Sequence, residues 1–90
     1  MDLGARLETL LKLAEEMEVE VRPEPMGGEG GGMCLVKGRR VLFVDTSADL
    51  ATRYERTLAA IADLPNVESV FLPPQVRDDL DRQRERRSHA

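Results

Sequence analysis

Two short apolar runs and the turn between them restrict the fold of this chain more than any other feature. Met33 to Val36 and Val41 to Val44 are separated by Lys37-Gly38-Arg39-Arg40. Gly38 can adopt the positive φ that a tight hairpin turn requires, so the two runs are expected to form antiparallel strands. The second run is apolar on both faces, which is typical of a strand inside a sheet. The sequence therefore predicts a β-hairpin whose second strand is central, with a helix on one face and partial cover on the other.

Apolar residues also recur at helical spacing in two segments that flank the hairpin, which predicts two amphipathic helices. The first runs from Leu3 to Met17. The second carries an apolar stripe made of Leu50, Tyr54, Leu58 and Ile61. Thr46 and Asp49 lie at capping-box spacing, with Asp in place of the usual Glu, so this helix is expected to start near Thr46. Pro65 and Asn66 are expected to end it.

Proline marks the remaining elements. Val19 to Arg22 alternates apolar and charged residues, which predicts a short edge strand whose ladder pairing stops at Pro23 and Pro25. Val67 to Leu72 is expected to form either a short last strand or an extended crossing. Pro73-Pro74 then opens a third helix. The apolar positions that continue the spacing of Leu72 along that helix are Val76 and Leu80.

This order of elements predicts an α+β fold. The simplest layered solution is a three- or four-stranded, mostly antiparallel sheet with helices packed mainly on one face. Ninety residues are enough for one core and leave no room for a second, so residues 1–85 are expected to form a single domain. Residues 86–90 carry nothing to bury, and we expect a disordered tail there.

The glycine-rich segment Gly27-Gly28-Glu29-Gly30-Gly31-Gly32 invites interpretation as a ligand site. A phosphate-binding loop needs glycines between a strand and a helix, whereas this segment leads into a strand. Its composition favours a flexible connection, and a loop that cradles a small ligand or anion is the alternative. If the second interpretation holds, the surface would include Gly30, Gly31, Gly32, Cys34 and Asp45.

The candidate reactive groups are sparse. Cys34 is the only cysteine and His89, the only histidine, lies in the predicted tail, so we expect a buried structural cysteine and not a nucleophile. No zinc site can be assembled from these residues. Asp45 and Asp49 could form a carboxylate site for magnesium or calcium, although helix capping explains both more simply. The sequence predicts no catalytic residue, no metal ligand and no cofactor.

Composition argues against nucleic acid and membrane partners. The net charge of −4 repels phosphate backbones, and the chain has only three aromatic residues on which a base could stack. The only basic cluster, Arg82 to Arg87, holds four arginines against one glutamate, but over Arg77 to Ala90 five basic residues face four acids. This near-balance predicts a solvated helix end in place of a basic binding patch. No run approaches the roughly 18 apolar residues of a membrane span. The first 26 residues form an amphipathic, acid-rich stretch in place of the basic leader and apolar run of a signal peptide. Together with the lone cysteine, this favours the cytoplasm.

Two family resemblances are present. The segments Gly31 to Gly38, Arg40 to Asp45 and Leu72 to Arg77 resemble those of a family of small uncharacterised bacterial proteins, which implies no activity. Val41 to Leu64 is similar in layout to the strand and active-site helix of ImmA/IrrE-type zinc peptidases. That family's helix reads Thr-Leu-Ala-His-Glu-Leu-Gly-His, whereas here Thr57-Leu58-Ala59 is followed by Ala-Ile-Ala-Asp-Leu. Both histidines and the glutamate are missing, so this resemblance implies a relative without catalysis.

These observations predict a non-enzymatic, cytoplasmic protein-interaction domain. The hairpin runs carry almost no charge, so they need cover either from the first helix, through Leu3, Leu7 and Leu10, or from a second copy. The second option would make a homodimer. The alternative function is a small-ligand or anion-binding domain that uses residues 27–32.

Overall fold

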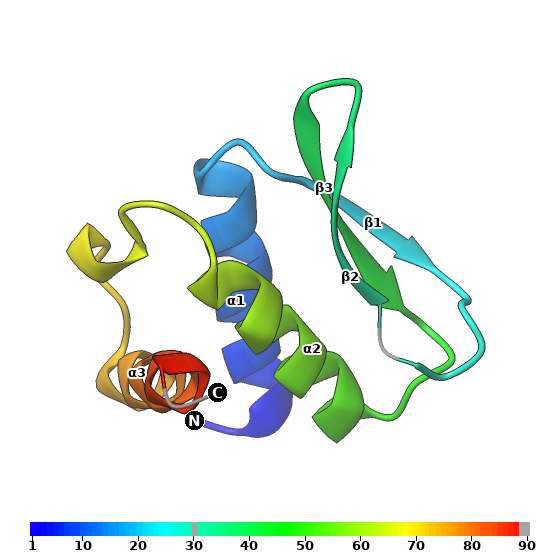
Figure 1. The fold of residues 1–90 in the computed structure, drawn as a ribbon. Coiled ribbons are helices and arrows are strands. Elements are labelled where there is room, and N and C mark those ends of the chain that lie inside the picture. The colour runs from blue at the N-terminus through cyan, green and yellow to red at the C-terminus, as the bar shows by residue number, and fades with distance from the viewer. Residues whose placement is uncertain (30, 89–90) are drawn as a thin grey trace.

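The computed structural model describes residues 1–29 and 31–88, which form helices stacked against one side of a small sheet (Figure 1). In chain order the elements are α1 (Leu3–Glu16), β1 (Glu20–Glu24), β2 (Gly31–Val36), β3 (Arg39–Asp45), α2 (Leu50–Ala62), the 3-10 turn η1 (Val67–Ser69) and α3 (Pro74–Ser88). The predicted α+β class is confirmed, with three strands among the described residues.

The predicted hairpin and its central strand are confirmed. β2 and β3 pair antiparallel from Gly31↔Val44 to Val36↔Arg39, and the sheet order is β1-β3-β2. Lys37 and Gly38 form the two-residue turn with φ values of 51° and 80°. Positive φ at both positions defines a type I′ turn, whose twist matches that of the flanking strands.

The expectation of a mostly antiparallel sheet is wrong for β1, which pairs parallel to β3 in the register Val21↔Leu42. The chain leaves β1 at one end of the sheet and enters β2 at that same end, so β2 is antiparallel to both other strands. β3, whose side chains are more deeply buried than those of β1 and β2, lies between these two strands. β1 also continues past Pro23 to Glu24, because an edge strand tolerates a proline where the missing N–H would face away from its neighbour.

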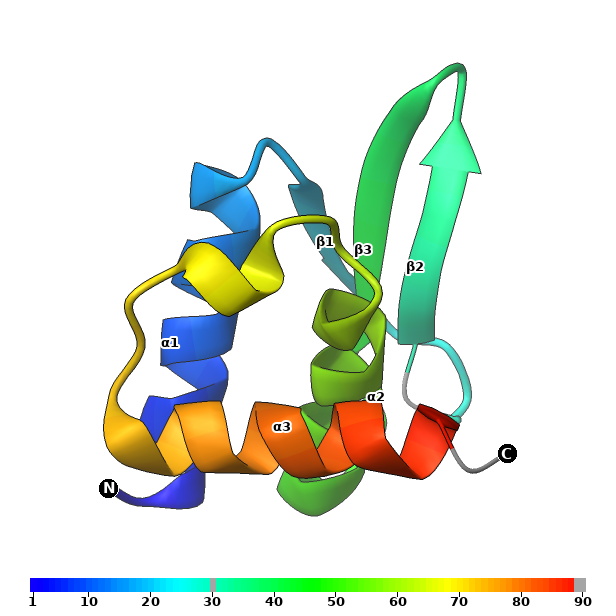
Figure 2. The same cartoon turned by 60° about the vertical axis from the view of Figure 1, so that its left-hand side comes forward.

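The helices lie on one face of the sheet, as predicted, and form two layers there. α1 packs against β1, and α2 packs against β2 and β3. Figure 2 shows α3 crossing α1 and α2 on the side away from the sheet, where it contacts both helices. The core between these layers has its fully buried large residues at Leu10, Leu42, Ile61, Val67, Val76 and Leu80. Leu7 and Leu10 of the first helix share this core with Leu42, but the helix packed on the two hairpin strands is α2, whereas α1, the expected cover, packs on β1.

The start of α2 differs from the prediction. Its N-cap is Asp49, whose carboxylate accepts the N–H of Thr52 at 2.7 Å, and the capping box expected from Thr46 does not form. The hydrogen bond from the Thr52 N–H is the main cause that lowers the pKa of Asp49. The cap therefore stabilises the helix at neutral pH, and this contribution is lost as the pH falls through the folded-state pKa.

The segment after α2 is an extended crossing preceded by η1, and the alternative of a last strand does not occur. Asn66 reverses the chain with a φ of 66°. The Arg77 guanidinium donates to the carbonyl oxygens of Val67 and Val70, which ties the crossing to α3. α3 continues to Ser88, so the predicted tail is helical over residues 86–88, and residues 89–90 lie outside the described part of the chain.

Candidate functional site at the edge of β2

The outer edge of β2 is an open strand edge with exposed apolar side chains beside it. β2 is an end strand, and its last three side chains lie exposed: Cys34, Leu35 at 71% and Val36 at 38%. The tip of the hairpin projects past the helices (Figures 1 and 2). Leu35 is paired with Arg40, on the same sheet face as Leu42, but too near this tip for helix cover. A large apolar side chain therefore stands in water beside an open strand edge.

Cys34 is exposed, and the prediction of a buried cysteine is wrong. In the β2–β3 register Cys34 is paired with Val41, on the sheet face opposite the helices. Val41 is only 1% exposed because strands flank it on both sides, whereas Cys34 lies on an end strand with a neighbour on one side only. The apolar run predicted a buried strand correctly for β3 and incorrectly for β2.

The turn fixes which backbone groups of β2 face outward. A type I′ turn joins its first and fourth residues, Val36 and Arg39, as a hydrogen-bonded pair. Hydrogen-bonded and non-hydrogen-bonded pairs alternate along an antiparallel ladder. Since the register has no bulge, Met33 and Leu35 belong to the non-hydrogen-bonded pairs and direct their N–H and C=O groups away from β3. These groups can accept another strand.

The opposite edge of the sheet, formed by β1, is chemically different. Pro23 removes one donor there, and Glu20 forms an ion pair with Arg22 on the same strand. Charge and proline are the features by which proteins block strand pairing at an edge. β2 has no charged residue and no proline over its six residues. The two edges therefore differ in their capacity to add a strand.

Asp45 lies at the other end of the hairpin and anchors the glycine-rich loop. Its side chain is fully buried, and Oδ1 accepts the N–H of Met26 at 2.8 Å and the N–H of Ser47 at 2.9 Å. The expected capping role therefore holds for Asp49 and not for Asp45. Gly31 and Gly32 lie in β2 and are half-buried, whereas Gly30 lies outside the described residues.

Replacing Asp45 with alanine is expected to destabilise the protein by about 2 kcal/mol, because the partly buried N–H groups of Met26 and Ser47 lose their acceptor. The matched change Asp49→Ala removes an exposed N-cap and should destabilise the protein less than Asp45→Ala does. Urea unfolding would compare the two variants. Amide exchange at Met26 should accelerate only in Asp45→Ala, and unchanged exchange there would contradict the anchoring role.

A second polar cluster joins the three helices. The Tyr54 hydroxyl donates to Asp79 Oδ2 at 2.6 Å, and Arg6 contacts the same oxygen at 3.1 Å. Burial raises the pKa of Tyr54 well above its usual range, and donation to Asp79 raises it further. The cluster lines a cavity of about 230 Å³. Sequence reasoning missed it because α1, α2 and α3 each supply one member. Both Tyr54 of α2 and Arg6 of α1 contact the same oxygen of Asp79 in α3, so the cluster links the three helices.

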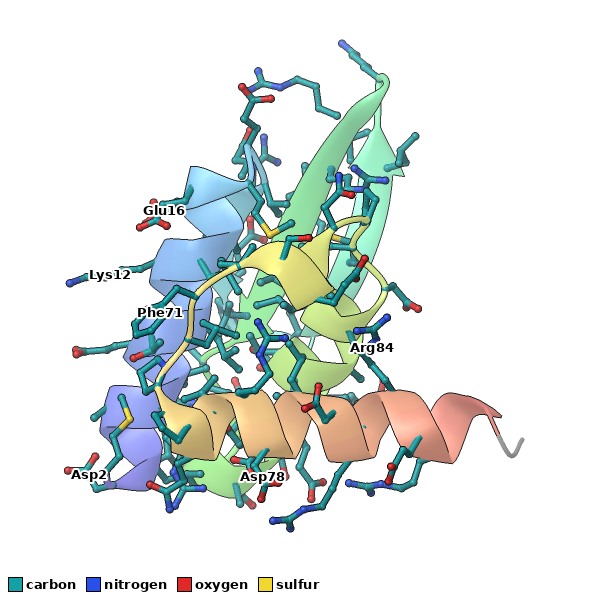
Figure 3. All side chains as sticks on the ribbon, turned by 90° about the vertical axis from the view of Figure 1, so that its left-hand side faces the viewer. Asp2, Lys12, Glu16, Phe71, Asp78 and Arg84 are labelled. Carbon is teal, nitrogen blue, oxygen red and sulfur yellow. The ribbon has the colours of Figure 1, made fainter. Side chains whose placement is uncertain are left out.

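Phe71 is the most exposed large apolar side chain among the described residues, at 92%. It lies in the crossing before α3, beside Lys12 and Glu16 of α1 (Figure 3). The adjoining hollow is small, about 160 Å³. Phe71 is one exposed apolar residue between charged ones, whereas the β2 edge exposes three consecutive uncharged residues.

Metal binding, membrane spanning and zinc-peptidase chemistry each require features that can be checked in the described residues. No group of three potential ligands among His, Cys, Asp and Glu lies close enough to hold a metal ion in residues 1–29 and 31–88. None of the helices there combines the length and the hydropathy that crossing a bilayer requires. The positions that match the histidines and glutamate of the ImmA/IrrE helix are Ala60, Ile61 and Leu64, and all three are buried.

Comparison with known proteins gave no relative for this chain: no family model matches it, and no significant match was found among curated proteins or solved structures.

Proposed function

We propose that this chain is a non-enzymatic protein-interaction domain that binds a polypeptide strand along the open edge of β2. The observation that carries the proposal is the exposure of Leu35 on an uncharged end strand. The partner class is protein, either a different chain or a second copy of this one. We place the domain in the cytoplasm, on the evidence of its single cysteine.

Strand addition would both pair the outward backbone groups of β2 and cover the exposed Leu35. The outward N–H and C=O groups of Met33 and Leu35 would gain ladder partners, and backbone pairing of this kind supplies affinity without requiring a particular sequence. Covering Leu35 would add on the order of 1.5–3 kcal/mol, the range for burying one large apolar side chain. No nucleic acid or membrane surface offers the strand edge that these groups match.

Leu35→Lys tests this proposal, because a charge on an edge strand opposes pairing. In wild-type protein isolated under native conditions, we expect a mass above the 10.1 kDa of one chain and slow amide exchange at Met33 and Leu35. Leu35→Lys should weaken that assembly at least tenfold and restore fast exchange at Met33. Native mass spectrometry and exchange measured by NMR give the two readouts.

Phe71→Lys is the matched control, since it places the same charge on a more exposed apolar residue far from β2. It should leave both the mass and the exchange at Met33 unchanged. A wild-type chain that is single in the native isolate and exchanges freely at Met33 and Leu35 would refute the proposed function. Loss of assembly in Phe71→Lys alone would move the interaction surface to the crossing before α3.

The alternative of an anion-binding glycine loop receives no support from the loop's geometry. The N–H of Met26 at the start of the loop points at Asp45, a carboxylate of the protein itself. An incoming anion would compete with that group and meet its negative charge. Gly31 also lies against the carbonyl of Phe43, where its lack of a side chain serves strand pairing.

A further inference from the structure

We infer that the strand received by β2 is the β2 of a second copy, paired antiparallel about a two-fold axis at Cys34. This inference rests on the proposed function and names the partner for the same edge. The result would be one continuous six-stranded sheet with the order β1-β3-β2-β2-β3-β1. Backbone pairing rules, the side chains along β2 and the charges at the two ends of β2 all favour this arrangement.

Backbone geometry leaves two registers that pair most of the strand. Met33 and Leu35 direct their hydrogen-bonding groups outward, so they must lie opposite equivalent residues of the partner. One register centres the axis on Met33, which then faces its own copy, with Leu35 opposite the partner's Gly31. The other centres the axis on Cys34, which places Leu35 opposite the partner's Met33 and Cys34 opposite the partner's Cys34.

The side chains select the axis at Cys34. Glycine offers Leu35 no side chain to pack against, whereas methionine offers a flexible apolar one. Met33 already packs on the edge of its own core. In the selected register each Leu35 would therefore extend the apolar surface of the partner's core. A two-fold axis perpendicular to the sheet keeps the helices of both copies on the same face, so α2 of each copy would flank the axis.

The charges at the two ends of β2 are complementary in this arrangement. The hairpin tip is basic, with Lys37, Arg39 and Arg40, and the loop that precedes β2 carries Glu29. With Cys34 on the axis, residue 37 of one copy lies level with residue 31 of the other. Each basic tip therefore approaches the partner's Glu29 loop, and the two-fold symmetry repeats this contact. These pairs offset part of the repulsion between two chains of net charge −4.

The assembly would also be closed. Its two outer edges are both β1, where Pro23 and the Glu20–Arg22 pair oppose further strand addition. Pairing through β2 thus stops at two copies, as an isologous interface requires. A second open edge would have allowed growth into fibres.

Cys34 supplies a built-in test of the register. Directly opposite residues in a non-hydrogen-bonded pair have Cα atoms about 4.5 Å apart, within disulfide reach. With the axis on Met33, the two Cys34 Cα atoms would be roughly 8 Å apart, beyond that reach. Mild oxidation of the wild-type chain at tens of micromolar should therefore convert most of it to a covalent dimer of twice 10.1 kDa, seen on a non-reducing gel.

Two variants in a Cys34→Ser background serve as controls. Phe71→Cys carries its thiol at a fully exposed site away from the interface and reports random collision, so its cross-linking should be at least tenfold slower. Met33→Cys should not cross-link, because its two copies would lie roughly 9 Å apart in the proposed register. Sedimentation of reduced wild-type protein should give a dimer mass.

The outcomes separate this inference from the proposed function. A dimer that cross-links through Met33→Cys and not through Cys34 overturns the register. A single-chain mass across tens of micromolar, with Cys34 no faster than Phe71→Cys, overturns the second copy as partner. If the native isolate then still holds another protein that Leu35→Lys releases, the proposed function stands and the inference alone has failed.

Discussion

Replacing Gly31 with alanine is expected to lower the free energy of unfolding by at least about 3 kcal/mol. An added Cβ would overlap the carbonyl oxygen of Phe43 and lie 2.8 Å from its carbonyl carbon. Both atoms belong to the central strand, so the clash cannot be relieved by a side-chain rotation. The φ of 87° at Gly31 adds strain for any residue with a Cβ. Urea unfolding followed by circular dichroism would measure the loss.

Gly27→Ala separates the clash from the strain. Gly27 has a similar φ of 82°, but a Cβ there would meet nothing within 4 Å. We expect a cost of about 1–2 kcal/mol from the backbone conformation alone. Equal effects at the two glycines would show that β2 does not approach β3 as closely as the structure has it. The comparison also tests the glycine-rich segment as a strand start, because Gly31 lies at the first pair of the β2–β3 ladder.

The sequence predicted the elements better than their arrangement. Helical periodicity located α1 and α2, because local spacing decides which face of a helix is apolar. Turn and proline signals located the hairpin and the start of α3. The parallel pairing of β1 could not be predicted in this way, since nothing within residues 19–22 specifies which strand lies beside it or in which direction. The wrong helix cap has a local cause: Thr46 and Asp49 are both good N-caps, and position alone does not choose between them.

The candidate site was predicted only in part. The uncharged hairpin pointed to an edge in need of cover, but burial of Cys34 was expected from the apolar run around it. Burial depends on how many strands flank a residue, and this is a property of the sheet order. Asp45 was selected as a site residue because it ends the central strand. Its actual role follows from a contact with Met26, which no spacing rule connects to it.

Replacing Leu80 with alanine is expected to destabilise the protein by about 2–5 kcal/mol, the range for truncating a well-buried leucine. α3 is the most polar of the three helices, and its fully buried apolar residues are Val76 and Leu80. They insert into the same core as Leu10 and Ile61. A helix with so few apolar anchors stays folded mainly through its packing, because isolated helices of this length are marginal in water. Losing Leu80 should therefore free α3 as well as open a cavity.

Asp81→Ala is the control for Leu80→Ala, because Asp81 is the next residue on the same helix and is exposed. It should change stability by less than about 0.5 kcal/mol. Thermal unfolding would compare the two variants, and loss of helical signal before the main transition would show that α3 detaches first. If Leu80→Ala were as mild as Asp81→Ala, α3 would not belong to the core. The Tyr54–Asp79 hydrogen bond and the Arg6 ion pair would then also have to be absent in solution, since both depend on α3 staying docked.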